Sequence, residues 1–186
     1  MSVKLLKRLF TVKEYHQMVD AGILNEDDRV ELIAGEIIRM SPIGRRHAAC
    51  VKCLNKLLSQ RLGDRALVSV QDPVQLDNYS EPEPDLALLA PRADFYESGH
   101  PQPDDILLVI EVADTTVESD RDVKIPNYAQ SGICEVWLVN INEQCVEVYL
   151  IPAPNGYRNV QKFYRGQSLS PQAFPDVNLT VDEILG

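Results

Sequence analysis

The sequence lacks a long hydrophobic run. The stretch 106–110 is among the longest and ends at Glu111, whereas a membrane-spanning helix needs about 20 consecutive apolar residues. The basic residues near the start, Lys4, Lys7 and Arg8, are not followed by the apolar segment of a secretory signal. We therefore expect no membrane contact and a soluble protein of the cytoplasm.

Cysteine is also scarce, with four residues at positions 50, 53, 134 and 145. A chain of 186 residues can bury a core without disulfide bonds, so we interpret all four as reduced thiols. Cys50 and Cys53 have the spacing of half a zinc site, but no second pair repeats it. They lie in a segment of helical periodicity, where cysteine often serves as a small buried hydrophobe.

Positive charge is in deficit, with 18 Lys and Arg against 28 Asp and Glu and a net charge of -10. The deficit is uneven, because residues 1–66 carry 12 basic and 8 acidic side chains, whereas residues 67–186 carry 6 and 20. A local basic surface can bind phosphate on an acidic protein. The net charge therefore does not exclude a nucleic-acid partner.

What remains is ordinary for a globular protein: 45% hydrophobic and 25% charged residues. The chain has no internal repeat, low-complexity tract or long linker, so we expect residues 1–186 to form a single domain. Hydrophobic periodicity and capping signals predict helices between Thr11 and Gly22, over 45–62, and from 119–122 to Gly132. Strands are predicted at 66–76, 85–89, 106–112, 135–140 and 145–151, with a hairpin over 29–40 and a docking tail that ends in a short helix at 181–185.

This order predicts an α/β fold with a mixed sheet. Its core is a helix, three strands, a helix and a strand, to which an N-terminal helix and β-hairpin are added. The run 106–112 is apolar almost throughout, as expected of a central strand that is buried on both faces.

Two carboxylates lie at the ends of apolar strands. Asp85 precedes Leu86-Ala-Leu-Leu, and Glu111 follows Ile106-Leu-Leu-Val-Ile. An ionised carboxylate beside a buried strand is costly unless a metal, a cation or hydrogen bonds compensate it. Two such groups on adjacent strands can share one Mg²⁺, which prefers oxygen ligands. The alternative is that Asp85 caps a turn and Glu111 pairs with a lysine.

These residues resemble the signature of the PD-(D/E)XK nucleases. More closely, from about residue 15 to 185 the chain resembles the bacterial restriction endonuclease-like family that is abundant in cyanobacteria. Six segments carry this resemblance in order: Val30-Glu-Leu-Ile-Ala-Gly-Glu-Ile, Arg46-His-Ala-Ala, Glu83-Pro-Asp-Leu-Ala, Val109-Ile-Glu-Val-Ala, Asp120-Arg-Asp-Val-Lys and Glu135-Val-Trp-Leu-Val. The resemblance implies a restriction-endonuclease-like core and a metal held by Asp85, Glu111 and the backbone carbonyl of Val112.

The signature lysine is displaced in this chain. It should lie two residues after Glu111, where Ala113 stands, and the resemblance implies that Lys124 on the following helix supplies the ammonium instead. Lys124 shares a predicted helix face with Arg121 and Tyr128, so its stem could cover apolar surface while its ammonium reaches the metal. A solvated helix lysine is the alternative.

Two further residues are candidates for the site. The resemblance suggests that Glu31, which faces Ile38 in the predicted hairpin, joins the metal site, whereas an ion pair with Arg29 or Arg39 is the alternative. His47 continues the apolar stripe of the 45–62 helix and could orient water or phosphate, or simply be a buried, hydrogen-bonded histidine. His16 and His100 have no comparable context. The basic side chains of the same helix could contact phosphates or form a solvated face: Arg45, Arg46, Lys52, Lys56 and Arg61.

Two classes of function follow. The first is a Mg²⁺-dependent (or Mn²⁺-dependent) endonuclease that hydrolyses phosphodiesters, with DNA as the expected substrate and catalytic residues Glu31, Asp85, Glu111, Lys124 and His47. The second is a non-catalytic nucleic-acid-binding or regulatory module that keeps the fold, which the acidic balance favours. The sequence leaves open a homodimer, from which an enzyme that cuts both strands would gain.

Overall fold

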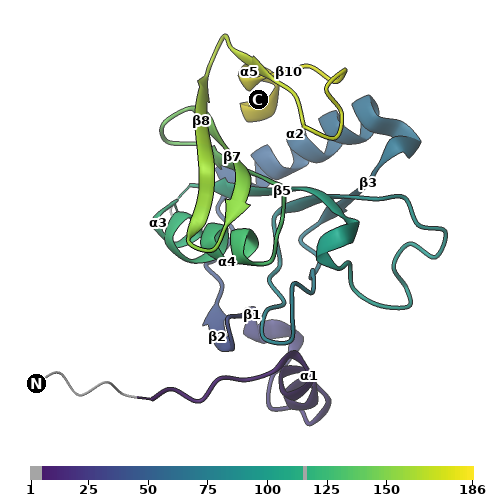
Figure 1. The fold of residues 1–186 in the computed structure, drawn as a ribbon, viewed down its shortest axis with the longest axis vertical. Helices are drawn as coiled ribbons and strands as arrows, with labels where there is room; N and C mark the ends of the chain where they lie inside the picture. The colour runs from purple at the N-terminus through teal and green to yellow at the C-terminus, as the bar shows by residue number, and fades with distance from the viewer. Residues whose placement is uncertain (1–5, 115–116) are drawn as a thin grey trace, which may run out of the picture.

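The computed structural model describes residues 6–114 and 117–186. Its centre is a mixed sheet of six strands in the order β3-β4-β5-β6-β7-β8. All neighbours are antiparallel except β5 and β6, which are parallel (Figure 1). The strands are β3 (Leu67–Val70), β4 (Leu86–Leu89), β5 (Ile106–Ala113), β6 (Glu135–Asn140), β7 (Cys145–Ala153) and β8 (Gly156–Tyr164).

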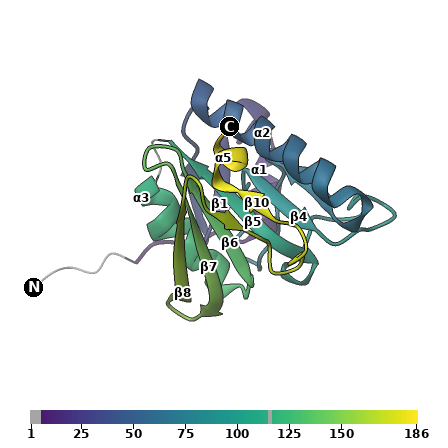
Figure 2. The same ribbon diagram turned by 90° about the horizontal axis from the view of Figure 1, so that it is seen from above.

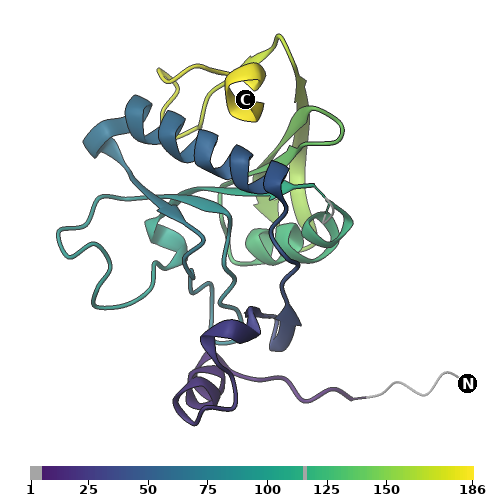
Figure 3. The same ribbon diagram turned by 180° about the vertical axis from the view of Figure 1, so that it is seen from behind.

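Helices cover both faces of this sheet. The long helix α2 (Arg45–Leu62) packs on one face together with α5 (Val181–Leu185), and α4 (Ile125–Gln130) packs on the other. Figure 3 shows α2 and α5 on the same side, and Figure 2 shows β7 and β8 at one edge of the sheet. Every helix in the described part of the chain is too short or too polar to cross a bilayer.

The alternation of side chains along β4 and β5 builds the two cores. Leu86 and Leu88 face α2, while Ala87 and Leu89 face α4, because successive strand residues point to opposite faces. Both strands are therefore apolar on both sides, as the sequence predicted for residues 106–112. A polar side chain in β5 must find its partners inside the protein.

Helix α2 has the predicted bounds and ends at Gly63. Its buried stripe contains Val51, Leu54, Leu58 and Leu62, as well as Cys50. The thiol of Cys50 lies 3.5 Å from the carbonyl oxygen of Ile184 in α5. All four cysteines are free, which confirms the prediction of reduced thiols.

The helix after β5 differs from the prediction. A helical turn over Val117–Ser119 (α3) leads into a π-helical turn over Asp120–Lys124, and α4 follows. Pro126 stands in the first turn of α4, where its missing N–H is tolerated. Single π turns inside helices often mark functional sites, and this one carries Lys124.

The N-terminal segments lie at the lower end of the molecule in Figure 1. Helix α1 (Val12–Asp20) has the predicted capping box of Thr11 and Glu14. The hairpin of β1 (Val30–Ile33) and β2 (Glu36–Arg39) has the predicted register, with Glu31 opposite Ile38. Gly35 has φ 77°, and an added Cβ would lie 2.6 Å from that of Leu9, so only glycine fits this turn.

Two strand predictions were wrong. The strand predicted over 66–76 ends at Val70, because an irregular segment with Asp72 and Pro73 follows it, and proline has no N–H to continue a strand ladder. Strand β8 was missed, because it is an edge strand whose mostly polar residues give no core pattern. The tail docks as predicted, through α5 and the short pair β9 (Ser168–Leu169) and β10 (Leu179–Thr180).

Candidate functional site

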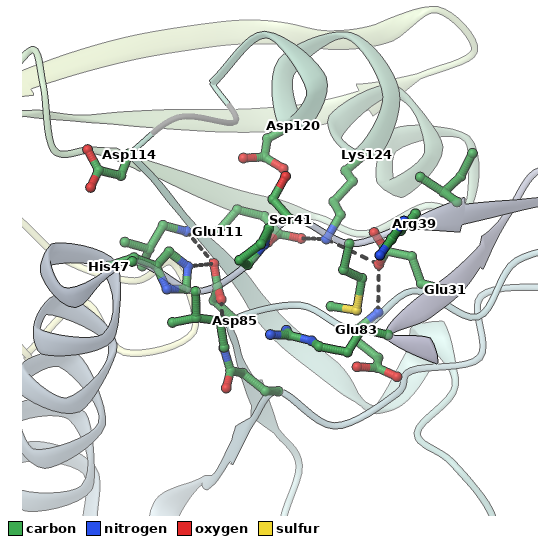
Figure 4. A pocket seen from close by; sticks show the side chains of 18 residues that line it. Glu31, Arg39, Ser41, His47, Glu83, Asp85, Glu111, Asp114, Asp120 and Lys124 are labelled. Atoms are coloured by element: carbon green, nitrogen blue, oxygen red, sulfur yellow. Dashed lines mark hydrogen bonds and ion pairs between the residues drawn. The ribbon is translucent and has the colours of Figure 1, made fainter. Parts of the chain in front are cut away.

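A pocket lies where the hairpin, the start of α2, the ends of β4 and β5 and the π-helical turn meet (Figure 4). Its volume is about 210 Å³, which is room for several waters at about 30 Å³ each. All six residues that the sequence analysis predicted for the site line this pocket: Glu31, His47, Asp85, Glu111, Val112 and Lys124. The fold therefore brings together side chains that are up to 93 positions apart.

Asp85 stands directly before β4, and the pairing of Leu86 with Ile110 puts it beside Glu111. Its Oδ2 accepts a hydrogen bond from the backbone N–H of Val112 at 2.8 Å and lies 2.9 Å from His47 Nε2. Its Oδ1 accepts from Gln71 Nε2 at 3.2 Å. These contacts fix the Asp85 carboxylate where β4 begins beside the end of β5. They leave lone pairs of the carboxylate oxygens free to accept from a further ligand.

Glu111 is the buried carboxylate of the pocket, with 2% of the residue exposed. Its Oε1 accepts a hydrogen bond from the Tyr128 hydroxyl at 2.6 Å and lies 3.4 Å from Lys124 Nζ. Burial raises the pKa of Glu111 to about 8; Lys124 opposes this rise and the charge of Asp85 adds to it. The protein groups around Glu111 therefore compensate its negative charge only in part.

Lys124 is not a solvated helix lysine, since 11% of its side chain is exposed. Its Nζ lies 3.2 Å from Glu31 Oε2 and 3.4 Å from Glu111 Oε1. Burial disfavours the charged form, but Glu111 and Glu31 outweigh it and raise the pKa of Lys124. Lys124 Nζ thus lies between the carboxyl groups of Glu31 and Glu111, which both favour its charged form.

Glu31 takes neither of the arginine partners that the sequence offered as an alternative. Besides Lys124, its Oε2 accepts a hydrogen bond from the backbone N–H of Glu83 at 3.1 Å. Glu83 itself lines the pocket, and burial, followed by the charge of Glu31, raises its pKa. The sequence contained Glu83 in the Glu83-Pro-Asp segment, but nothing there gave it a role.

His47 lies in the first turn of α2, and the side chains of His47 and Asp85 are 15% and 13% exposed. The hydrogen bond to Asp85 raises the pKa of His47, although burial opposes the charged form. Its Nδ1 is buried and finds no hydrogen-bond partner in the described part of the chain. His47 therefore combines a tendency to be charged with one unused nitrogen.

The charges around the pocket do not balance. Six carboxylates line it against three permanent cations, which are Arg29, Arg39 and Lys124. Carboxylates and backbone carbonyls are the hard oxygen donors that suit Mg²⁺ or Mn²⁺. The donor set therefore fits a divalent cation. The six carboxylates belong to Glu31, Glu83, Asp85, Glu111, Asp114 and Asp120.

The basic side chains of α2 are only partly available for a ligand. Arg46 Nη1 pairs with Asp114 at 3.1 Å, and Arg61 Nη2 pairs with Glu183 at 2.7 Å. Arg45, Lys52 and Lys56 are exposed. The sequence offered Arg29 and Arg39 only as partners of Glu31 and missed their place at the pocket, where both are exposed, because single arginines in a hairpin carry no signal of phosphate binding.

A model of the Uma2 family, described as "putative restriction endonuclease", matches residues 12–182. The chain belongs to the Uma2 family. The match covers the hairpin, both strands that carry the carboxylates, and the π-helical turn. The resemblance that the sequence motifs indicated is therefore confirmed.

Four solved chains match this Uma2 protein in structure. One is the crystal structure of a "putative nuclease belonging to DUF820" from Anabaena variabilis, with a TM-score of 0.72 and 16% sequence identity. The alignment covers 95% of this chain and 97% of the other. The likeness confirms the nuclease fold with its mixed sheet. No curated protein gives a significant sequence match.

Proposed function

We propose that this Uma2 protein is a metal-dependent endonuclease that hydrolyses phosphodiester bonds, with DNA as the substrate. The observation that carries the proposal is the acidic pocket, in which Asp85 and Glu111 stand at the adjoining ends of β4 and β5 with Lys124 beside them. Membership of a nuclease family supports a hydrolase. The metal, the substrate and the residue roles below are parts of the proposal.

Asp85, Glu111 and the carbonyl oxygen of Val112 are the proposed metal ligands. The N–H of Val112 points to Asp85, and the N–H and C=O of one strand residue point to the same side of the strand. The Val112 carbonyl therefore faces the pocket along with both carboxylates. Mg²⁺ or Mn²⁺ held there would polarise a phosphate oxygen and make a water more acidic.

Lys124 acts as a fixed positive charge and not as a base. Because Glu111 and Glu31 raise its pKa, its ammonium stays protonated and can donate to a phosphoryl oxygen as negative charge develops. Glu31 accepts from that ammonium and so sets its position.

His47, Arg29 and Arg39 are proposed to bind the phosphate backbone of the substrate. All three line the pocket, and the hydrogen bond with Asp85 favours the charged form of His47. Cationic donors beside a cluster of carboxylates would reduce the repulsion between the acidic pocket and a phosphate polymer. Cleavage of both strands of a duplex would use two such pockets, which a homodimer would supply.

A plasmid-nicking assay with Mg²⁺, Mn²⁺ or EDTA tests the proposal. We expect cleavage with either metal, none with EDTA, and strongly reduced cleavage in Asp85→Asn and Lys124→Met. Glu97→Gln, in the exposed excursion between β4 and β5, is the control and should cleave like the wild type. Cleavage that persists in the pocket variants would indicate a contaminant, and DNA binding without any cleavage would favour the non-catalytic module.

A further inference from the structure

We propose that His16, Glu81 and His100 form a second metal site, separate from the acidic pocket, which takes a borderline transition-metal ion such as Zn²⁺. The three residues come from α1, from the segment before β4 and from the excursion between β4 and β5. One ligand atom from each lies within 4.8 Å of the other two. Neither histidine had any functional context in the sequence.

The two histidines already face the carboxylate. His16 Nε2 lies 2.6 Å from Glu81 Oε1, and the rings of His16 and His100 approach edge to face with centroids 6.3 Å apart. Zinc binds histidine nitrogen and carboxylate oxygen at about 2.0–2.2 Å, so two ligand atoms of a tetrahedral site lie about 3.4 Å apart. Small side-chain movements would therefore complete the site.

Glu81 supplies an independent observation that points to a ligand. It is only 4% exposed, and its Oε2 is buried without a hydrogen-bond partner in residues 6–114 and 117–186. A buried carboxylate oxygen that stays unpaired is costly. A metal ion would satisfy it, and both histidines could move to the ion because they are exposed.

The donor set determines the class of ion. Two imidazole nitrogens and one carboxylate suit Zn²⁺ and similar transition metals, with a water in the fourth position, and suit Mg²⁺ poorly. The acidic pocket has the opposite preference, because its proposed ligands are all oxygens. The two sites should therefore take different ions from a mixture.

In a second cluster of potential metal ligands, a lysine already supplies the positive charge. Glu143, Cys145 and Glu147 also have close ligand atoms, but Lys162 Nζ lies between the two carboxylates, 3.2 Å from Glu143 and 2.9 Å from Glu147. A lysine ammonium already provides the cation there. No lysine or arginine forms an ion pair with Glu81 among the described residues.

Metal at this site would join three segments that are distant in sequence. Position 81 is fixed to the hairpin by the backbone hydrogen bond from Glu81 N–H to the Leu32 carbonyl, at 2.7 Å. His16 would add α1 to this anchor, and His100 would add the exposed excursion. Closing such long loops stabilises the folded state, so the ion would serve as a structural clamp four residues before Asp85.

Cobalt(II) is the probe for the experiment, since the intensity of its visible absorption distinguishes a four-coordinate protein site from the six-coordinate ion in water. The full chain is stripped of metal and titrated with Co²⁺ in excess Mg²⁺, which occupies the acidic pocket. We expect one Co²⁺ to bind the wild type, and the double variant His16→Gln/His100→Gln to bind at least about tenfold more weakly. Both side chains are exposed, so the double variant should fold. Zn²⁺ should raise the melting temperature of the wild type more than that of the double variant.

The control uses the remaining histidine. The chain has three histidines, and His47→Gln should bind Co²⁺ as tightly as the wild type. Equal affinity of the wild type and the double variant, or no uptake by the wild type, would overturn the inference. So would loss of binding in His47→Gln alone, which would assign the ion to the acidic pocket. None of these outcomes depends on nuclease activity.

Discussion

Two buried glutamates in the sheet differ in the number of cations that contact them. Glu111 on β5 and Glu147 on β7 are 2% and 1% exposed, and each accepts a hydrogen bond from a tyrosine hydroxyl, at 2.6 Å and 2.5 Å. Glu147 also contacts two cations, Arg121 Nη2 at 2.6 Å and Lys162 Nζ at 2.9 Å. Among the residues that the structure describes, Glu111 contacts one cation, Lys124, which it shares with Glu31.

The number of cations per carboxylate explains the difference in pKa. Burial works against the ionised form of Glu147, but its hydrogen bonds to Tyr149, Lys162 and Arg121 outweigh burial and lower its pKa. At Glu111 burial dominates and raises the pKa to about 8. The charge of Glu147 is matched by two cations, whereas Glu111 shares one cation with Glu31 and is better suited to bind a further one.

The largest expected effect is on the cleavage rate, and it should differ between two basic residues of the same π-helical turn, Lys124 and Arg121. Lys124→Met should lower the rate of metal-dependent cleavage by about 10²–10³-fold, the usual cost of losing a charge-stabilising donor. Arg121→Met removes a cation from Glu147 and should leave the cleavage rate within a few-fold of the wild type. Single-turnover nicking rates measure both, and equal losses would contradict the division of roles.

The next largest effect should be on metal binding, which should depend on the acidic pocket and not on Glu147. Saturation of the acidic pocket with Mg²⁺ at a hundredfold excess over its dissociation constant should stabilise the fold by about 2.7 kcal/mol. Asp85→Asn should remove most of this gain, while Glu147→Gln and Glu97→Gln should keep it. Calorimetric melting with and without Mg²⁺ measures the gain, and an undiminished shift in Asp85→Asn would rule out that ligand.

Without metal, the Glu147→Gln and Glu111→Gln variants should differ in their free energy of unfolding. Glu147→Gln leaves Arg121 without its carboxylate and leaves Lys162 with Glu143 as its remaining partner. Because both cations are partly exposed, we expect a loss of about 2 kcal/mol, below the full cost of breaking a buried pair. Glu111→Gln removes a charge that burial already disfavours, so its loss should stay under about 1 kcal/mol. Urea unfolding in EDTA tests the order, which should not reverse.

The smallest expected effect is a pH dependence. The pKa of Glu147 is lower in the folded protein than the ordinary glutamate value of 4.5, so its stabilising contribution is present above about pH 4.5 and is lost as the pH falls through the folded pKa. The difference in unfolding free energy between the wild type and Glu147→Gln should therefore shrink below pH 4.5. A difference that grows with acid would contradict the lowered pKa.

Much of the fold was predictable because local signals agreed with the final packing. The stripe of α2, the capping box of α1 and the turn at Gly35 each depend on residues a few positions apart. Strand β8 and the π-helical turn escaped prediction for the opposite reason. The first is defined by pairing with β7, and the second carries Lys124, whose contacts are with Glu31 and Glu111 in distant segments.

The sequence by itself determined the helices, the apolar central strands, the family and the nomination of Glu31, His47, Asp85, Glu111 and Lys124, because motif order and periodicity are local properties. Only the tertiary structure decided how charges are shared. It assigned one lysine to Glu31 and Glu111, two cations to Glu147, and two unremarked histidines to Glu81. Charge compensation depends on distances between segments far apart in the chain, and those distances exist only after folding.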